Sequence, residues 1–348
     1  MEVFTIGRVL VDLYANELHR PLDEVETFSK YLGGSAGNMA VGLARLGHKT
    51  GLISKVGDDP HGVFLRRYLE ESGVDTRFVG TDPKYRTALV FAALFPPADS
   101  RILFYRDPCA DTEVRIEDVD VDVVADAELL VVTGTALARS PMRETVLHLM
   151  RERRRRGKRN VMDVDYRPVL WRDGSEMVLY YDLAVRMTDV LIGNELEIAF
   201  AREAVRAGGQ GGDAVLERLR MPGAAGGTPE KHRFEREELV AAARDLVAEG
   251  VGVVVVKVGA AGSFAVTADG IYEAAGFPVD VVNTLGAGDG FAAGYCSGLL
   301  KGWDLERCLR RGNAVGAIVV SRHGCAPAIP TLDELEAFLA ERAGGLDA

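Results

Sequence analysis

The sequence predicts an α/β protein with a doubly wound, mostly parallel β-sheet and a small second β-sheet that serves as a lid. Three observations support this prediction. Short, fully apolar runs recur along the chain, and amphipathic stretches of helical period separate several of them. Apolar strands separated by helices are typical of a parallel sheet that is covered on both faces. Two further segments are extended and hairpin-like, and they interrupt the alternation.

The alternation marks out the strands of the main sheet. They are VFTIGRV (3–9), TGLISKV (50–56), LLVVTG (129–134), RNVMDVD (159–165), DVLIG (189–193) and VVVVKVG (253–259). The clearest helices between them are GNMAVGLARLG (37–47) and ELVAAARDLVAEG (238–250). The pattern favours one large domain over residues 1–348 rather than two domains in series.

The two hairpin-like segments, residues 11–34 and 86–107, carry turn residues in their middles. Because they are similar in character, they are expected to pair into a small β-sheet beside the main domain. Such a sheet would form a lid over a cleft at the carboxyl ends of the parallel strands, where open α/β sheets bind ligands. If the chain forms a homodimer, this lid is the expected interface. Residues 206–233 are rich in Gly and Pro and are expected to form a flexible surface insertion.

Composition limits the classes of partner. The 348 residues carry a formal net charge of −11, which argues against nucleic acid because phosphate binding needs a basic face. The basic run RERRRRGKR (151–159) is expected to be a solvated helix end. The N-terminus lacks a signal-peptide pattern, and the longest apolar run, VGVVVVKVGA (251–260), is too short for a membrane span. Four scattered cysteines without CxxC spacing argue against a disulfide framework or a zinc cluster, so we expect a reduced, cytoplasmic protein.

The most specific segment is NTLGAGDGFAAGYCSGLL (283–300), in which a Gly-Ala-Gly turn opens a helix. The amides of Gly286, Ala287 and Gly288 would be unpaired donors at the positive end of that helix and would form an anion site. Asp289 follows in the same turn. A carboxylate repels a bound phosphate, but it is useful as the base that takes a proton from a hydroxyl attacking phosphorus. A simple helix cap is the alternative interpretation of Asp289.

A second Gly cluster is LGGSAGNMAVGLARLG (32–47). Gly33 and Gly34 allow the backbone to approach a ligand closely, and Asn38 offers a donor and an acceptor at a helix start. The segment has no GK[ST], so it is not a Walker A loop. It is also a poor match to the dinucleotide-binding fingerprint, because it precedes rather than follows a clear strand. An ordinary Gly-rich turn is the alternative.

Two later segments are candidates for a nucleotide and metal site. IGNELEIAF (192–200) places Asn194 and Glu197 on one face of a helix that follows a strand, where polar groups can hold metal-bound water. Helix capping is the alternative. The segment KVGAAGS (257–263) could lie against a nucleotide or form a plain hairpin turn, and its candidate residues are Lys257, Gly259 and Gly262.

Taken together, these motifs resemble the ribokinase-like (PfkB) family of carbohydrate kinases over almost the whole chain. The shared order is an early Asp, GG…N, NxxE, a Gly-x-x-Gly turn, GAGD and a late Asn. In this sequence the motifs are at Asp12, Gly33–Asn38, Asn194–Glu197, Gly259–Gly262, Gly286–Asp289 and Asn313.

The resemblance implies an ATP-dependent sugar kinase in which each motif has a role. Asp289 would be the catalytic base, and the anion hole for the transferred phosphoryl group would be formed by Gly286, Ala287 and Gly288. Mg²⁺ would be held through water by Asn194 and Glu197. The ATP site would contain Lys257, Gly259, Gly262 and Asn313, and sugar hydroxyls would be bound by Asp12, Gly33, Gly34 and Asn38.

One position departs from the family pattern. The second motif of the family usually begins Asp-Thr, whereas this chain has Asn283 and Thr284. In relatives that Asp helps to hold a monovalent cation. A carbonyl ligand could survive here but the charge does not, so a K⁺ site is left open.

Further stretches narrow the substrate. IGRVLVDLYANE near the start, FYRDPCAD (104–111), MDVDYRPVLW (162–171) and SRHGCAPAIP (321–330) are similar to kinases that convert 5-dehydro-2-deoxygluconate to its 6-phosphate in myo-inositol breakdown. The segment DVDYRPVLW is also similar to 2-keto-3-deoxygluconate kinases.

Both of these substrates are sugar acids, and two arginines could bind their carboxylate. Arg106 lies on the expected lid and Arg167 at a strand end, and Arg pairs with carboxylate through two parallel hydrogen bonds. A structural ion pair is the alternative for each. The alternative functions are a 2-keto-3-deoxygluconate kinase, a fructokinase-like enzyme, and a non-catalytic sugar-binding regulator on the same fold.

Overall fold

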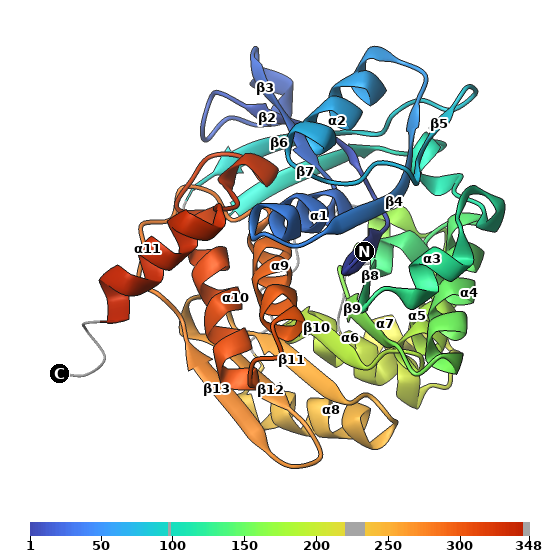
Figure 1. Ribbon diagram of the computed structural model, residues 1–348, viewed down its shortest axis with the longest axis vertical. Coiled ribbons are helices and arrows are strands. Elements are labelled where there is room, and N and C mark those ends of the chain that lie inside the picture. The colour runs from blue at the N-terminus through green and yellow to red at the C-terminus, as the bar shows by residue number, and fades with distance from the viewer. Residues whose placement is uncertain (97–98, 220–233, 344–348) are drawn as a thin grey trace. The chain divides into compact units, whose positions relative to one another are not determined.

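The computed structural model describes residues 1–96, 99–219 and 234–343 (Figure 1). The chain divides into two compact units: unit 1 consists of Met1–Glu113 and Ala274–Ala348, and unit 2 is the continuous segment Val114–Glu273. None of the helices within the described ranges is long and apolar enough to cross a membrane.

Unit 1 combines the two ends of the chain. Its elements are β1 (Val3–Ile6), β2 (Leu10–Ala15), β3 (Phe28–Gly33), α1 (Ser35–Arg45), β4 (Thr50–Gly57), α2 (Pro60–Glu71), β5 (Val79–Asp82), β6 (Leu89–Phe95), β7 (Asp99–Tyr105), α9 (Ala287–Leu300), α10 (Leu305–Val320) and α11 (Leu332–Ala343). Strand β4 is parallel to both β1 and β5. Helices α1 and α2 share a buried core with β4, which includes Val41, Leu52 and Leu65. The apolar alternation of the sequence therefore corresponds to parallel strands with helices packed on them.

A separate four-stranded sheet has the order β3-β2-β6-β7. Strand β2 is antiparallel to β3 and parallel to β6, and β6 is antiparallel to β7. The segments 11–34 and 86–107 thus each supply a hairpin, and the two hairpins join through β2 and β6 (Figure 1). The predicted small sheet is present, and its closure as a lid stays a prediction.

Helices α9 and α10 pack side by side in unit 1 (Figure 1). The close approach depends on glycine. A Cβ on Gly294 would lie 2.8 Å from the carbonyl oxygen of Arg311, and a Cβ on Gly298 would lie 2.7 Å from Cys308 Sγ. The small residues of the GAGD helix therefore hold α9, and with it the turn at its N-terminus, against α10.

Unit 2 contains α3 (Val121–Asp126), β8 (Leu129–Thr133), α4 (Met142–Arg155), β9 (Arg159–Asp163), α5 (Gly174–Val185), β10 (Val190–Asn194), α6 (Glu195–Arg206), α7 (Gly212–Arg218), α8 (Arg236–Ala248), β11 (Val253–Lys257) and β12 (Gly262–Val266). Strand β13 (Ile271–Ala275) spans the boundary between the units. Strands β8, β9, β10 and β11 are successive parallel neighbours, and β12 returns antiparallel to β11. The predicted mostly parallel architecture is confirmed.

One expectation for unit 2 is wrong in part. The basic run 151–159 is not wholly solvated, because Arg153 is fully buried. Its guanidinium donates to the carbonyl oxygens of Val124, Ala127 and Arg159 at 2.7, 2.9 and 2.8 Å. Buried carbonyls need donors, and this side chain supplies several at once.

The flexible insertion expected over residues 206–233 is described only in part. Residues 206–219 include α7, and residues 220–233 lie outside the described residues.

Candidate active site

In unit 1, Asp12 on β2 lies against the end of β3. A Cβ built on Gly33 would come within 2.2 Å of the Asp12 carboxyl group, so any side chain at Gly33 would displace that carboxylate. Gly34, with a φ of 91°, forms the N-cap of α1, and its Cβ would lie 2.6 Å from the carbonyl oxygen of Arg8. Both glycines are therefore required by close approach to other parts of the protein, and their predicted approach to a ligand stays a prediction.

Asp289 lies in the first turn of α9, and Gly286, in the left-handed conformation, is the N-cap of that helix. As a glycine, Gly286 has no side chain with which to cap the helix. The N-cap position itself is thus occupied by Gly286, and the role of Asp289 as a base stays a prediction. The Ala287 N–H makes a long contact of 3.4 Å with the carbonyl oxygen of Thr284. The first-turn amides still lie at the positive end of a long helix, where an anion is stabilised.

Asn38 joins the two Gly-rich motifs of unit 1. Its Nδ2 donates a hydrogen bond of 2.7 Å to Asp289 Oδ2. The side chain is 3% exposed, and Oδ1 has no hydrogen-bond partner among the described residues. Since an unpaired buried acceptor is unfavourable, Oδ1 is suited to accept a hydrogen bond from a ligand hydroxyl. Asn38 thus contacts the predicted base, and its binding of a sugar hydroxyl stays a prediction.

Asp12 has an unusual electrostatic environment. Burial raises the pKa of Asp12 from 3.8 to about 7, and the negative charge of Asp289 also raises it. The charge of Arg8 acts in the opposite direction, and so do the nearby polar side chains of Cys325 and Tyr14. Near neutral pH this carboxyl group therefore exchanges readily between its protonated and ionised forms.

Sequence reasoning did not assign a role to three residues of this cluster, namely Arg8, Tyr14 and Cys325. Arg8 lies in the connection from β1 to β2 and is buried, and its Nη2 donates to Ser35 Oγ at 2.8 Å. Tyr14 Oη and Cys325 Sγ are 2.6 Å apart, and both side chains are buried. Cys325 could have been identified from the sequence, because it lies in SRHGCAPAIP, one of the segments that resemble sugar-acid kinases. For Arg8 and Tyr14 the only indication of a role in the site was that they lie near Asp12 in the sequence.

Arg106, a predicted carboxylate ligand, is part of a buried ion pair. The Nη2 and Nε atoms of Arg106 lie 2.6 and 2.8 Å from Asp111 Oδ2, and Arg106 is 6% exposed. The thiol of Cys109 donates to Asp111 Oδ1 at 2.7 Å. The ion-pair alternative is therefore realised in the structure, and carboxylate binding by Arg106 stays a prediction.

Asn283, the residue that departs from the family pattern, is 3% exposed. Its Oδ1 accepts a hydrogen bond of 3.0 Å from the N–H of Leu285, and its Nδ2 has no partner among the described residues. The oxygen is thus used to shape the turn that precedes Gly286. The side chain presents an N–H donor, which cannot ligate a cation.

In unit 2, Asn194 and Glu197 form a capping box at the start of α6. Asn194 Oδ1 accepts from the N–H of Glu197 at 2.9 Å, and Glu197 Oε2 accepts from the N–H of Asn194 at 2.7 Å. Glu197 Oε1 also accepts from the N–H of Tyr166 at 3.2 Å. Both carboxylate oxygens are therefore engaged by backbone amides. This arrangement suits a metal held through water better than direct ligation.

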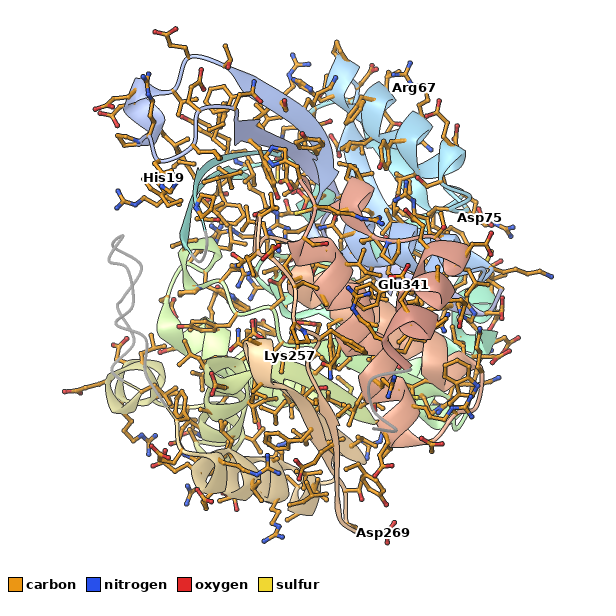
Figure 2. The ribbon with its side chains drawn as sticks, turned by 90° about the vertical axis from the view of Figure 1, so that its left-hand side faces the viewer. His19, Arg67, Asp75, Lys257, Asp269 and Glu341 are labelled. Atoms are coloured by element: carbon orange, nitrogen blue, oxygen red, sulfur yellow. The ribbon has the colours of Figure 1, made fainter. Side chains whose placement is uncertain are left out.

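Charged side chains surround Glu197 at the carboxyl ends of neighbouring strands. Lys257, at the end of β11 (Figure 2), lies 3.0 Å from Asp163 Oδ2 and 3.9 Å from Glu197 Oε2. Arg167 Nη1 lies 4.0 Å from Glu197 Oε1, and Nη2 lies 3.4 Å from Asp165 Oδ1. Asp163 was missed at the sequence level, although it lies within a predicted strand (159–165), and it is the last residue of the observed β9. Within the described residues no group of three or more His, Cys, Asp or Glu side chains could hold a metal ion directly.

The remaining predicted nucleotide residues have clear structural positions. Gly259 and Gly262 flank the turn of the β11–β12 hairpin, with φ values of 59° and 106°. Apart from its chain neighbours, no atom of the described residues lies within 4 Å of a Cβ built on Gly259, so this face of the turn is open with respect to the described part of the chain. In unit 1, Asn313 Nδ2 donates to the carbonyl oxygens of Ala274 and Ala275 at 2.9 and 3.1 Å. Their contacts with ATP stay predictions.

Comparison with known proteins gives one consistent family. The sequence profile of the pfkB family carbohydrate kinases matches residues 1–332. The 5-dehydro-2-deoxygluconokinase of Geobacillus kaustophilus is 38% identical over 347 residues, which cover 99% of this chain and 95% of that protein. The enzyme of the same name from Bacillus subtilis is 35% identical over 340 residues, covering 97% and 95%.

The fold agrees with these relatives. A ribokinase II candidate from E. coli, solved in complex with ATP and Mg²⁺, superposes with a TM-score of 0.81 at 25% identity and covers 98% of this chain and 99% of that one. The ribokinase-like fold and the resemblance inferred from the ordered motifs are thereby confirmed. Because the profile match extends from Asp12 through Asn313, it includes every motif located above in both units. The chain belongs to the pfkB family of carbohydrate kinases.

Proposed function

We propose that this carbohydrate kinase phosphorylates 5-dehydro-2-deoxygluconate, giving the 6-phosphate, with ATP as the phosphoryl donor. The observation that supports the reaction is the buried cluster of unit 1. In that cluster Asn38 donates to the carboxylate of Asp289 at 2.7 Å, and Asp12 lies close enough for the charge of Asp289 to raise its pKa. The substrate is supported by the relatives of that name, which match at 35–38% identity over nearly their full length.

Asp289 acts as the base in this proposal. It accepts the proton of the substrate hydroxyl as that oxygen forms its bond to the γ-phosphorus, while the bond from phosphorus to the bridging oxygen of ADP breaks. The hydrogen bond from Asn38 fixes Oδ2 of Asp289 and so orients the carboxylate that receives the proton. The first-turn amides of α9 supply donors for the charge on the transferred group.

ATP supplies the phosphoryl group, and Mg²⁺ neutralises charge on its phosphate oxygens. In unit 2, Asn194 and Glu197 would hold the metal through water, because both Glu197 oxygens already accept backbone hydrogen bonds. Lys257 lies beside Glu197 and Asp163 and provides a cation for phosphate oxygens. The open face of the turn at Gly259 is suited to close approach by a nucleotide.

A homodimer through the four-stranded sheet is also proposed. It is supported by apolar side chains on β7, since Leu103 and Tyr105 are 46% and 60% exposed. An exposed apolar strand in a sheet edge favours association with another chain. Light scattering of the parent and of Leu103→Glu tests this, and a monomeric parent would contradict it.

The activity itself is tested with a panel of sugars in an assay that couples ADP release to a recorded signal. We expect the highest kcat/KM with 5-dehydro-2-deoxygluconate, compared with 2-keto-3-deoxygluconate and fructose, and mass spectrometry should identify a monophosphate. Asp289→Asn is the matched negative control. It is nearly isosteric, and loss of the base should reduce kcat by about 10²–10⁴-fold with an unchanged melting temperature. A higher kcat/KM for either competitor would refute the substrate, and a variant within a few-fold of the parent would refute the base.

A further inference from the structure

Cys325 lies where the segment after α10 enters the sugar-binding side of unit 1. Gly324, with a φ of 92°, precedes it, and a short 3-10 helix, Ala326–Ala328, follows it. The thiol is 4% exposed and is 2.6 Å from Tyr14 Oη on β2. It also lies close enough to the carboxyl group of Asp12, on the same strand as Tyr14, to lower the pKa of that group. Cys325 thus contacts the predicted sugar-binding carboxylate.

The same side chain packs against the turn that begins α9. A Cβ built on Gly286 would lie 2.9 Å from Cys325 Sγ and 3.1 Å from Cys325 Cβ. Since Gly286 is the N-cap of the helix that carries Asp289, the position of this turn affects both the anion site and the base. One side chain therefore lies between the two parts of the site that must hold the same substrate molecule.

Aromatic contacts fix the position of Tyr14, whose hydroxyl group contacts the Cys325 thiol. The ring of Tyr14 makes edge contacts with Tyr31 at 5.4 Å and with His323 at 6.3 Å, and Tyr31 and His323 are themselves 6.0 Å apart. Tyr31 comes from β3, and His323 comes from the same segment as Cys325. With its ring held on two sides, Tyr14 has a fixed hydroxyl position, and that hydroxyl can orient the thiol.

We propose that Cys325 is a positioning residue for the kinase reaction, whose thiol holds the Asp12 carboxyl group at a fixed distance from the start of α9. In this arrangement the Tyr14 hydroxyl donates to Sγ, and the thiol donates to Asp12. The proposal rests on the sugar-binding role of Asp12 within the proposed function. Burial, together with the neighbouring charge of Asp12, raises the pKa of the Cys325 thiol, so the thiol keeps the proton that it donates.

A purely packing role is the alternative, since Cys325 also belongs to an apolar cluster with Tyr14, Ala92 and Leu94. Three substitutions separate the two roles. Cys325→Ala removes the donor, Cys325→Ser retains a donor and an acceptor, and Tyr14→Phe removes the hydroxyl with little change in shape. Cys308→Ala is the matched control, because it removes another fully buried thiol of unit 1 that packs between α10 and α9.

The primary measurements are KM and kcat for 5-dehydro-2-deoxygluconate with saturating ATP. A hydrogen bond to a carboxylate stabilises binding more than a neutral one, so Cys325→Ala should raise KM by about tenfold or more, with kcat within about threefold. Tyr14→Phe should raise KM by roughly twofold to tenfold, because its hydrogen bond joins two neutral groups. Cys325→Ser should restore KM to within about threefold of the parent. Cys308→Ala should change the melting temperature but leave KM unchanged.

A pH profile of KM supplies a readout that packing alone would not move. The groups that face Asp12 are Arg8 from the β1–β2 connection, Tyr14 from β2, Asp289 from α9 and Cys325 itself. The ionised carboxylate is the better acceptor for a sugar hydroxyl, so KM of the parent should fall as the pH rises through about 7. The thiol hydrogen bond lowers the pKa of Asp12. The pH range over which KM falls should therefore move to higher pH in Cys325→Ala and return to that of the parent in Cys325→Ser.

The KM values and pH profiles of these variants distinguish a positioning role of Cys325 from a packing role. Equal KM values and superimposable pH profiles for the parent and Cys325→Ala would overturn the proposal. It would also be overturned if Cys325→Ser raised KM as much as Cys325→Ala, because the donor would then be irrelevant. If Cys325→Ala fails to fold, an unchanged KM and pH profile in Tyr14→Phe would overturn the proposal in its place. If the parent accepts another sugar instead, the proposed substrate fails, and the same variant-to-parent ratios measured with the accepted sugar still decide the role of Cys325.

Discussion

Replacing Asp12 with Asn should change how the stability of the protein depends on pH. The Asp12 pKa is about 7 in the folded protein, against 3.8 for an ordinary aspartate, mainly because the carboxylate is buried. The folded state therefore holds this proton more tightly than the unfolded chain does. The resulting contribution to stability is fully present below about pH 4 and is lost as the pH rises through about 7.

The magnitude follows from the two pKa values. Each unit of difference corresponds to about 1.4 kcal/mol, so burial of the Asp12 carboxyl group costs about 4 kcal/mol at pH 8, where it is ionised, and about 2 kcal/mol at pH 5, where the folded protein must bind its proton. Between those two pH values, the parent should lose roughly 2–3 kcal/mol of unfolding free energy more than Asp12→Asn does. The variant also leaves Arg8 without its acidic neighbour, but that penalty does not depend on pH in this range and cancels in the comparison.

The assay is urea unfolding of the parent and Asp12→Asn at pH 5, 6, 7 and 8, together with melting temperatures. The control is Asp269→Asn, which makes the same chemical change at an exposed turn (Figure 2). Its pH dependence should parallel that of the parent. If the curve of Asp12→Asn also ran parallel to the parent, Asp12 would be ionised throughout, and the electrostatic account of this site would be refuted. A stabilised Asp12→Asn at pH 8 with a sharply raised KM would show that the carboxylate is retained for binding at the expense of stability.

Further predictions concern the cation, the arginines and the four-stranded sheet. Asn283 lacks a ligand charge, so activity should respond less to K⁺ than in relatives with Asp there; a strict K⁺ requirement in a titration against Na⁺ would contradict this. Arg106→Ala should lower the unfolding free energy by roughly 3–5 kcal/mol, because a buried carboxylate loses its partner, whereas Arg167→Ala should leave the melting temperature unchanged. If either Arg binds the substrate carboxylate, its Ala variant should raise KM for sugar acids about tenfold to a hundredfold and spare neutral sugars, and equal losses for both would exclude it. Hydrogen exchange in residues 11–34 and 86–107 should slow when the sugar acid is added, and unchanged exchange in both would contradict closure.

The strands of the main sheet could be predicted well because burial on both faces leaves an uninterrupted apolar run. Each predicted strand begins within about one residue of the observed start, as β8 does at Leu129. The predicted strands extend past the observed ends of β1, β9 and β11. At β1 and β9 the polar residues that follow the strand, such as Arg8 and Asp165, leave the sheet and belong to the connections that carry the polar groups of each unit.

The motifs around Gly33 and Gly286 were found because glycine is required where backbone and side chains approach closely. Their partnership was not visible, since the hydrogen bond between Asn38 and Asp289 joins residues 251 positions apart. Arg106 shows the opposite case, because its ion-pair partner Asp111 lies within the same quoted segment, FYRDPCAD. A local pairing of opposite charges could have favoured the structural interpretation of that residue.

Cys325 and Arg153 were missed for a shared physical reason. The role of each depends on complete burial, and neither a lone cysteine nor an arginine in a basic run indicates burial by its sequence context. Arg153 satisfies carbonyl oxygens that come from residues on both sides of it in the sequence. Only the folded backbone defines that set of acceptors, so no local pattern could have singled this arginine out from its neighbours.

The assembly of unit 1 from both ends of the chain sets the order in which the protein matures on the ribosome. Unit 2, from Val114 to Glu273, is continuous and can fold as soon as it has emerged. The strand that carries Asp12 is synthesised early, yet the helix that carries Asp289 emerges only after all of unit 2. At translation rates of about 5–20 residues per second, on the order of tens of seconds separate these events. During that interval α1 still lacks the helix α9 that packs against it, and the apolar surface left exposed favours chaperone binding to the nascent chain.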